Sequence, residues 1–285
     1  EAIISMQTIK LNNGVEMPQL GYGVFQVSPE ECERSVSEAI QVGYRSIDTA
    51  QIYRNEEGVG HAIHKSGISR SEFFITTKVW ISNAGYERAL ASIDESLRRL
   101  QTDYIDLLLV HQPFGDYFGT YRAMEEAYRA GKLRAIGVSN FLVDRFLDLA
   151  HFVEIPPTVN QVETHVFTQQ QELQQVMQET DTKLMSWGPF AEGKNDYFRT
   201  PTLVAIGEKY GRSAAQVALR YLLQKGIILI PKSVRRERMA QNFDIFDFAL
   251  DAEDMERIKE LDTKKPLIAD HRNPEFVRFI LGVTL

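Results

Sequence analysis

Short apolar runs alternate with longer amphipathic segments along the whole chain. The apolar runs cover residues 19–25, 44–48, 73–79, 104–110, 134–139, 158–161, 183–187 and 227–230. Most of them are continuously apolar, which is typical of parallel strands that are covered on both faces. The pattern therefore predicts eight buried strands.

Segments with helical character separate these strands. They cover residues 29–42, 86–100, 117–130, 169–179, 202–210, 213–224 and 252–261. Ser28 followed by Pro29 is a typical helix start, and Gly43 is a typical stop. In residues 86–100 the apolar side chains recur at helical spacing, which predicts one buried face.

Eight strands with helices between them predict an α/β fold, a closed (β/α)8 TIM barrel in a single domain of residues 6–285. The alternative is an open, doubly wound sheet. Asn12-Asn13-Gly14 lies between two short apolar runs and predicts an N-terminal β-hairpin, which would cap the bottom of the barrel. Residues 1–5 precede a methionine, and we expect them to be a remnant of the expression procedure.

Composition narrows the possible partners. The 285 residues carry 39 acidic and 32 basic side chains, a net charge of −7, which argues against a nucleic-acid partner. The longest apolar runs are far shorter than the roughly 20 residues of a membrane helix. A single cysteine, Cys32, excludes an internal disulfide and a cysteine zinc site. With one cysteine and no signal peptide, we expect a cytoplasmic protein. We also expect a monomer that has no metal site and no membrane or nucleic-acid partner.

The glycine motifs of the common nucleotide-binding folds are incomplete. The first predicted strand holds Gly21 and Gly23, but the third glycine of a dinucleotide fingerprint is missing. Gly58 and Gly60 lie in a helical context and also lack it. There is no Walker A motif. A nucleotide that binds this chain must therefore bind in another way.

Polar or aromatic side chains stand where the predicted strands end. In a barrel of this kind the carboxyl ends of the strands surround one mouth, where the chemistry takes place. The side chains are Asp48, Lys78, His111, Ser139, Asn140, Gln161, Trp187 and Lys232, with Tyr53 in the loop after the second strand. We expect them to converge on one site.

The residue types at these ends suit carbonyl reduction. They include no nucleophile–base pair and no carboxylate cluster for a metal. A lysine beside Tyr53 would stabilise the phenolate and lower the pKa of the phenol, and Asp48 would hold that lysine. A neutral His111 could donate to a carbonyl oxygen, so the group is suited to protonating a forming oxyanion. Since no side chain supplies a hydride, a cofactor is implied.

Other strand-end residues could hold such a cofactor. The amides of Asn140 and Gln161 can pair with a carboxamide, and Trp187 offers a flat stacking face. After the last strand, residues 232–238 contain one lysine and three arginines at a predicted helix start. A basic helix N-terminus at this place in a barrel predicts an anion site.

Several separate motifs resemble the aldo-keto reductase family, in the same order along the chain. They are GYRSIDTA at 43–50 followed by Tyr53, Asn55 and Glu56, TKVW at 77–80, LLLVH at 107–111, GVSNF at 137–141, NQVE at 160–163 and IPKS at 230–233. The closest branch by resemblance is that of the bacterial 2,5-diketo-D-gluconate reductase and related reductases of small carbonyl compounds.

The resemblance implies a role for each motif residue. Tyr53 would be the proton donor, Lys78 and Asp48 its tuning pair, and His111 the group that orients the carbonyl. The cofactor NADPH (NADP+) would be held at its nicotinamide by Ser139, Asn140, Gln161 and Trp187, along its pyrophosphate by Gly188, Pro189 and Phe190, and at its 2′-phosphate and adenine by Lys232, Ser233, Val234, Arg238, Gln241 and Asn242. The substrate pocket would be lined by Phe25, Trp80, His111 and Gln112.

The chain departs from the family pattern at a few places. Gln112 stands where a tryptophan is common, Trp187 replaces a tyrosine, and Gln241 replaces a glutamate. Only fifteen residues follow Asp270, which predicts a shallow, open pocket. The expected function is an NADPH-dependent reductase of aldehydes and ketones such as keto sugars, keto acids or methylglyoxal-like compounds. The alternatives are a cofactor-binding sensor or regulatory subunit with little turnover, and an isomerase or aldolase with Lys78 as a Schiff base.

Overall fold

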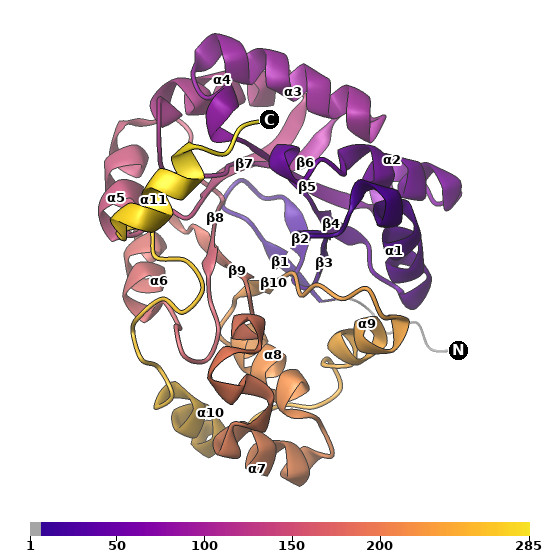
Figure 1. Cartoon of the computed structure of the whole chain (residues 1–285), viewed down its shortest axis with the longest axis vertical. Coiled ribbons are helices and arrows are strands. Elements are labelled where there is room, and N and C mark those ends of the chain that lie inside the picture. The colour runs from indigo at the N-terminus through magenta and orange to yellow at the C-terminus, as the bar shows by residue number, and fades with distance from the viewer. Residues whose placement is uncertain (1–6) are drawn as a thin grey trace.

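Eight parallel strands form one sheet, in which each strand pairs with its neighbours in the chain (Figure 1). The computed structural model describes residues 7–285; the expected remnant at 1–5 lies outside the described residues. The strands are β3 (Tyr22–Gly23), β4 (Ser46–Asp48), β5 (Phe74–Val79), β6 (Ile105–Val110), β7 (Leu133–Ser139), β8 (Val159–Glu163), β9 (Lys183–Trp187) and β10 (Ile228–Leu229). Every predicted strand is present, although β3 and β10 are shorter than expected.

Hydrogen bonds between the first and last strands close the sheet into a barrel. The Gly21 amide donates to the Leu229 carbonyl at 2.7 Å, and the Leu229 amide donates to the Gln19 carbonyl at 2.9 Å. Leu20 and Leu229 form a parallel bridge at this seam. The predicted (β/α)8 barrel is therefore confirmed, and the open doubly wound sheet is wrong.

Helices surround the strands on the outside (Figure 1). They are α1 (Pro29–Val42), α2 (Glu56–Lys65), α3 (Tyr86–Leu100), α4 (Tyr117–Arg129), α5 (Val143–Phe152), α6 (Gln171–Met177), α7 (Pro201–Tyr210), α8 (Ala214–Gln224), α9 (Arg236–Phe243), α10 (Ala252–Lys259) and α11 (Pro274–Leu281). Helix α1 has the predicted bounds, since the Ser28 hydroxyl caps it and Gly43 follows it at φ 129°. Among the described helices, none is long and apolar enough to span a membrane.

The pattern of the chain did not predict α2, α5 or α11. Helix α2 contains Gly58 and Gly60, which lower helix propensity. Packing explains both glycines: a Cβ at position 60 would lie 2.6 Å from the Leu100 carbonyl oxygen, and one at position 58 would lie 2.8 Å from the Cys32 Cβ. Both glycines of α2 are therefore required by close packing, of Gly60 against Leu100 in α3 and of Gly58 against Cys32 in α1.

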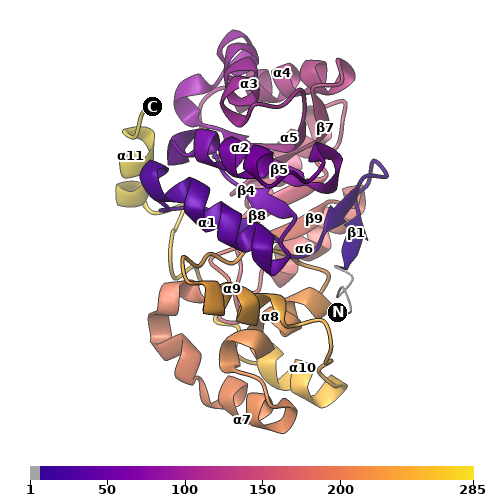
Figure 2. The ribbon, with the colours of Figure 1, turned by 90° about the vertical axis from the view of Figure 1, so that its right-hand side faces the viewer.

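The N-terminal hairpin covers the bottom of the barrel, as predicted. Its strands β1 (Thr8–Lys10) and β2 (Glu16–Pro18) pair antiparallel. Met17 is fully buried among interior side chains of the barrel such as Phe74. The amides of Asn12 and Asn13 donate to the Pro157 and Arg134 carbonyls at 3.0 and 2.9 Å. In Figure 2 the hairpin and α11 lie on opposite sides of the barrel.

Candidate active site

A buried ion pair lies at the carboxyl ends of β4 and β5. The Lys78 ammonium donates to Asp48 Oδ1 at 2.5 Å and to the Thr49 carbonyl oxygen at 2.8 Å. Lys78 is 0 % exposed and Asp48 is 2 % exposed. A buried charge is tolerated only when it is paired and hydrogen-bonded, so each of these groups requires the other.

The third direction of the Lys78 ammonium points to Tyr53. This tyrosine lies in the short 3-10 helix Gln51–Tyr53 that follows β4, and the distance from Lys78 Nζ to the phenolic oxygen is 3.4 Å. All three N–H donors of the ammonium therefore have an oxygen partner. The phenol, the ammonium and the carboxylate that the sequence predicted at one mouth are brought together.

Burial changes the acid–base balance expected from the sequence. Burial raises the pKa of Tyr53, and the Lys78 ammonium opposes this rise without overcoming it. The expectation that lysine would bring the pKa below its ordinary value is therefore corrected. Because the phenol lies where its anion would be poorly solvated, it holds its proton at neutral pH. The lysine limits the cost of losing that proton.

His111 directly follows β6 and faces the phenol. The ring centroids of His111 and Tyr53 are 5.8 Å apart, and those of His111 and Trp80 are 4.9 Å apart, both edge to face. Burial and the nearby Lys78 charge lower the pKa of His111 well below its usual range. The imidazole is therefore neutral at pH 7 and can donate a hydrogen bond without carrying a charge.

The residues expected to hold a nicotinamide are linked to these groups. The Asn140 side chain donates to the His111 carbonyl at 3.0 Å and accepts from the Trp187 indole at 2.8 Å. The Gln161 amide donates to Asp48 Oδ2 at 2.9 Å. Ser139 donates to the Gln161 backbone carbonyl at 2.7 Å. In the described chain no hydrogen bond reaches Gln161 Oε1, so one amide acceptor stays free for a carboxamide N–H.

Asn140 has a backbone conformation that few residues adopt. Its φ is 65°, in the left-handed region, directly after β7. Asparagine tolerates this region better than most residues, and such strain is concentrated at functional sites. The turn places the Asn140 amide between His111 and Trp187, so that this one side chain is hydrogen-bonded to both residues.

A basic segment follows β10 and runs into α9. Lys232, Arg235 and Arg238 are exposed, and in residues 7–285 none of them has an ion-pair partner. The Ser233 carbonyl accepts from the Tyr22 hydroxyl at 2.6 Å, which fixes the segment to the barrel. Unpaired cations at a helix start fit a phosphate group. Val234 and Gln241 are exposed beside them, and Asn242 is buried.

The C-terminal tail reaches the mouth although it is short. The Trp80 indole donates to the Val283 carbonyl at 2.7 Å, and Arg54, next to Tyr53, donates to the Thr284 carbonyl at 3.0 Å. His271 and Gln112 are hydrogen-bonded at 2.8 Å. The tail therefore lies beside Trp80 and Tyr53, at the mouth where the sequence predicted a shallow, open pocket. No local pattern pointed to these contacts, because they join residues 159 or more positions apart.

Phe25 completes the rim on the tyrosine side. Its ring centroid is 5.3 Å from that of Tyr53, and its side chain is 49 % exposed. Of the four residues predicted to line the substrate pocket, Phe25 and His111 therefore lie against the phenol ring, and Trp80 packs on His111. Gln112 is tied to His271 in the tail.

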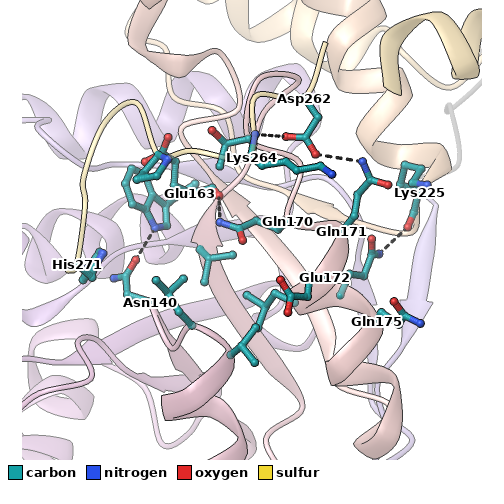
Figure 3. Close-up of a pocket in the computed structure, with 18 of the residues that line it drawn as sticks. Asn140, Glu163, Gln170, Gln171, Glu172, Gln175, Lys225, Asp262, Lys264 and His271 are labelled. Atoms are coloured by element: carbon teal, nitrogen blue, oxygen red, sulfur yellow. Dashed lines mark hydrogen bonds between the residues drawn. The ribbon is translucent and has the colours of Figure 1, made fainter. Parts of the chain in front are cut away.

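A cavity of about 960 Å³ continues from Asn140 and Trp187 along α6 (Figure 3). Its far wall is the segment after α10, including Asp262, Lys264 and His271. Glu163, at the end of β8, lies between the two walls. In the part of the chain that the structure describes, no group of three or more His, Cys, Asp or Glu side chains could hold a metal ion.

Comparison with known proteins assigns the family. Residues 17–263 match the model of the aldo/keto reductase family. The chain belongs to the aldo/keto reductase family. It is therefore an oxidoreductase of this family, and the resemblance inferred from the motifs is confirmed.

Named relatives cover almost all of the chain. A glyoxal reductase from Bacillus subtilis (strain 168) is 50 % identical over 256 residues, which are 89 % of this chain and 92 % of the relative. The methylglyoxal reductase DkgA from Escherichia coli (strain K12) is 40 % identical over 92 % of this chain and 96 % of its own length. The crystal structure of a Bombyx mori aldo-keto reductase in complex with NADP has a TM-score of 0.88 and 33 % identity, and covers 94 % of this chain and 97 % of that chain.

Proposed function

We propose that this member of the family is an NADPH-dependent reductase of small aldehydes and ketones, with α-oxo aldehydes such as glyoxal and methylglyoxal as preferred substrates. The observation that carries the proposal is the Lys78 ammonium, which lies between Asp48 at 2.5 Å and the Tyr53 hydroxyl at 3.4 Å, with a neutral His111 opposite. This arrangement is suited to supplying a proton to an oxygen atom.

The chain's own groups act on the carbonyl oxygen. His111 donates a hydrogen bond that orients the carbonyl, and Tyr53 transfers its phenolic proton to the oxygen as negative charge develops there. The Lys78 ammonium stabilises the phenolate that remains, and Asp48 keeps the ammonium in place. NADPH, when bound, supplies the hydride that no side chain can provide.

The residues that would hold NADPH fit its two ends. The free Gln161 Oε1, with Ser139 and Asn140 beside it, suits the carboxamide, and the Trp187 ring suits the nicotinamide face. The exposed cations Lys232, Arg235 and Arg238 suit the 2′-phosphate that distinguishes NADPH from NADH. The NADP complex of the Bombyx mori relative supports this assignment.

The preference for small substrates rests on two observations. The relative that shares 50 % of its residues over most of the chain is named a glyoxal reductase. The Phe25 ring packs on Tyr53, and the Trp80 ring packs on His111. The tail contacts Trp80 and Arg54, which leaves less room at the mouth. An α-oxo aldehyde needs little room beside Tyr53 and His111.

The test is a panel of carbonyl substrates, in which turnover is measured as the loss of NADPH absorbance. The same panel is run in parallel with NADH. We expect turnover with glyoxal and methylglyoxal, a larger kcat/KM for these than for a keto sugar, a keto acid or an aromatic aldehyde, and a preference for NADPH. Binding of NADPH without turnover of any carbonyl would favour a cofactor-binding sensor instead. Trapping of a substrate on Lys78 by borohydride would favour Schiff-base chemistry.

A further inference from the structure

Three consecutive backbone amides converge on the carboxylate of Glu163. Leu267 donates to Oε2 at 2.8 Å, and Ile268 and Ala269 each donate to Oε1 at 3.1 Å. His165 Nε2 lies 2.7 Å from Oε2. Glu163 is 4 % exposed and His165 is 0 % exposed. A carboxylate held by successive N–H groups is a concave anion site of the kind that turns form, here filled by the protein itself.

The amides belong to the segment 262–272, which connects α10 to α11 and which we call the strap. Residues 263–266 of the strap are exposed, and Leu267, Ile268 and Ala269 are only half-buried. Two hydrogen bonds hold its first residues. The Thr263 amide donates to the carbonyl of Phe167, which follows β8, and the Gln171 side chain, at the start of α6, donates to Asp262. At the centre of the strap, the Leu267 side chain packs against the core and the Leu267 carbonyl accepts from Lys194 at 3.1 Å. The Glu163 carboxylate is the group that holds three successive strap amides there.

The strap lies over residues expected to hold the cofactor. Glu163 is the register partner of Trp187 in the pairing of β8 with β9. A Cβ at Gly188 would lie 2.7 Å from Ile268 Cδ1, so the Ile268 side chain rests on the backbone of Gly188. At its far end, the strap places His271 against Gln112, next to His111. Figure 3 shows Glu163 between Asn140 on one side and Asp262 and Lys264 on the other.

We propose that Glu163 is a positioning residue whose carboxylate latches the strap over Trp187 and Gly188, and that release of this latch governs the exchange of NADPH. The proposal rests on the proposed function, because it assigns the nicotinamide and pyrophosphate to these two residues. Burial would raise the pKa of Glu163, but the hydrogen bonds from His165 and from the strap amides outweigh it and lower the pKa. The latch is therefore ionised at neutral pH.

Glu163→Gln would open the latch without removing volume. One carboxylate oxygen would become an NH2 group, a donor that would face backbone N–H donors. Glu163→Asp keeps the charge but withdraws it by one methylene, so it should open the latch less. A matched control is Glu260→Gln, since Glu260 is an exposed residue of the same cavity.

The first measurement needs no cofactor. Hydrogen exchange at the amides of residues 267–269 in the Glu163→Gln protein should be at least tenfold faster than in the wild type, and exchange in β6 should be unchanged. In a Trp80→Phe background, Trp187 is the single tryptophan. Its emission should become at least twofold more accessible to acrylamide in Glu163→Gln, and unchanged in Glu260→Gln.

The second measurement uses NADPH. Glu163→Gln should speed NADPH dissociation in stopped flow about tenfold, and Glu163→Asp should speed it less. The single-turnover rate at saturating NADPH should stay within threefold of the wild type, because Tyr53, Lys78 and His111 are untouched. A merely structural effect would lower the turnover rate and the exchange protection of β6 together.

The outcomes separate the latch from the function. Unchanged exchange at 267–269 in Glu163→Gln overturns the latch, and so does unchanged NADPH dissociation from an opened strap. A wild-type protein that binds no NADPH overturns the proposed function and the role in cofactor exchange with it. If Glu163→Gln fails to fold, Glu163→Asp carries the same measurements, and an unchanged strap and dissociation rate in that variant overturn the latch.

Discussion

The groups that we propose as catalytic and the strap are held in opposite ways. Asp48, Lys78 and His111 lie on or directly after strands of the barrel and are buried, with hydrogen bonds that run within the barrel mouth. The strap lies on the surface and is held at its centre by the carboxylate of Glu163. The groups that the proposed proton transfer requires at fixed positions thus lie on rigid strands, whereas the strap over Trp187 and Gly188 is attached at its centre by hydrogen bonds near the surface.

The largest expected effect is on the rigid side. Replacing Tyr53 with phenylalanine removes the proton donor and leaves the ring in place, so kcat should fall about 10²–10⁴-fold, the usual contribution of a general acid. NADPH affinity should be unchanged. Steady-state kinetics and NADPH titration measure the two. Near-normal turnover would show that Tyr53 is not the acid.

Removal of the buried cation tests how much the barrel mouth depends on its ion pair. Lys78→Met leaves the Asp48 carboxylate buried without its counter-ion, with the Gln161 amide as its remaining side-chain partner. The free energy of unfolding should fall by about 3–5 kcal/mol. The matched control is Lys132→Met, which breaks the exposed pair with Asp94 at 2.8 Å and should cost less than about 1 kcal/mol. Urea denaturation measures both, and equal losses would contradict the comparison.

The basic segment after β10 is exposed and should affect binding alone. Arg238→Ala should weaken NADPH by about 1.5–3 kcal/mol, the range for a hydrogen bond to a charged group. NADH binding should not change, because NADH lacks the 2′-phosphate. Fluorescence titration with both cofactors checks this. Arg257→Ala, on α10, is the control. An equal loss of affinity for NADPH and NADH in Arg238→Ala would contradict the assignment of Arg238 to the 2′-phosphate.

The smallest expected effect concerns the tail. Trp80→Phe keeps an aromatic ring beside His111 but removes the hydrogen bond to the Val283 carbonyl. Since a neutral hydrogen bond contributes about 0.5–1.5 kcal/mol, KM for the carbonyl should rise roughly two- to tenfold with little change in kcat. Initial rates over a range of glyoxal concentrations give both constants. An unchanged KM would mean that the tail does not shape the substrate pocket.

Helix and strand boundaries were predictable where local signals were strong. Helix α3 has the predicted bounds because its apolar residues repeat at helical spacing, and β9 because its run is continuous. Helix α2 was missed because its glycines serve contacts with Leu100 and Cys32, which lie far away in the sequence. A local pattern carries no information about such contacts.

The sequence by itself determined the order of strands and helices, the hairpin, the strand-end residues and, through its motifs, the family. These follow from local periodicity and from the rule that parallel strands of a barrel end at one mouth. Only the tertiary structure decided that burial outweighs the Lys78 charge in its effect on the pKa of Tyr53. It also decided that the tail contacts Trp80 and that the Glu163 carboxylate holds the strap amides. Solvation and long-range contacts exist only once the chain is folded, so no spacing along the sequence records them.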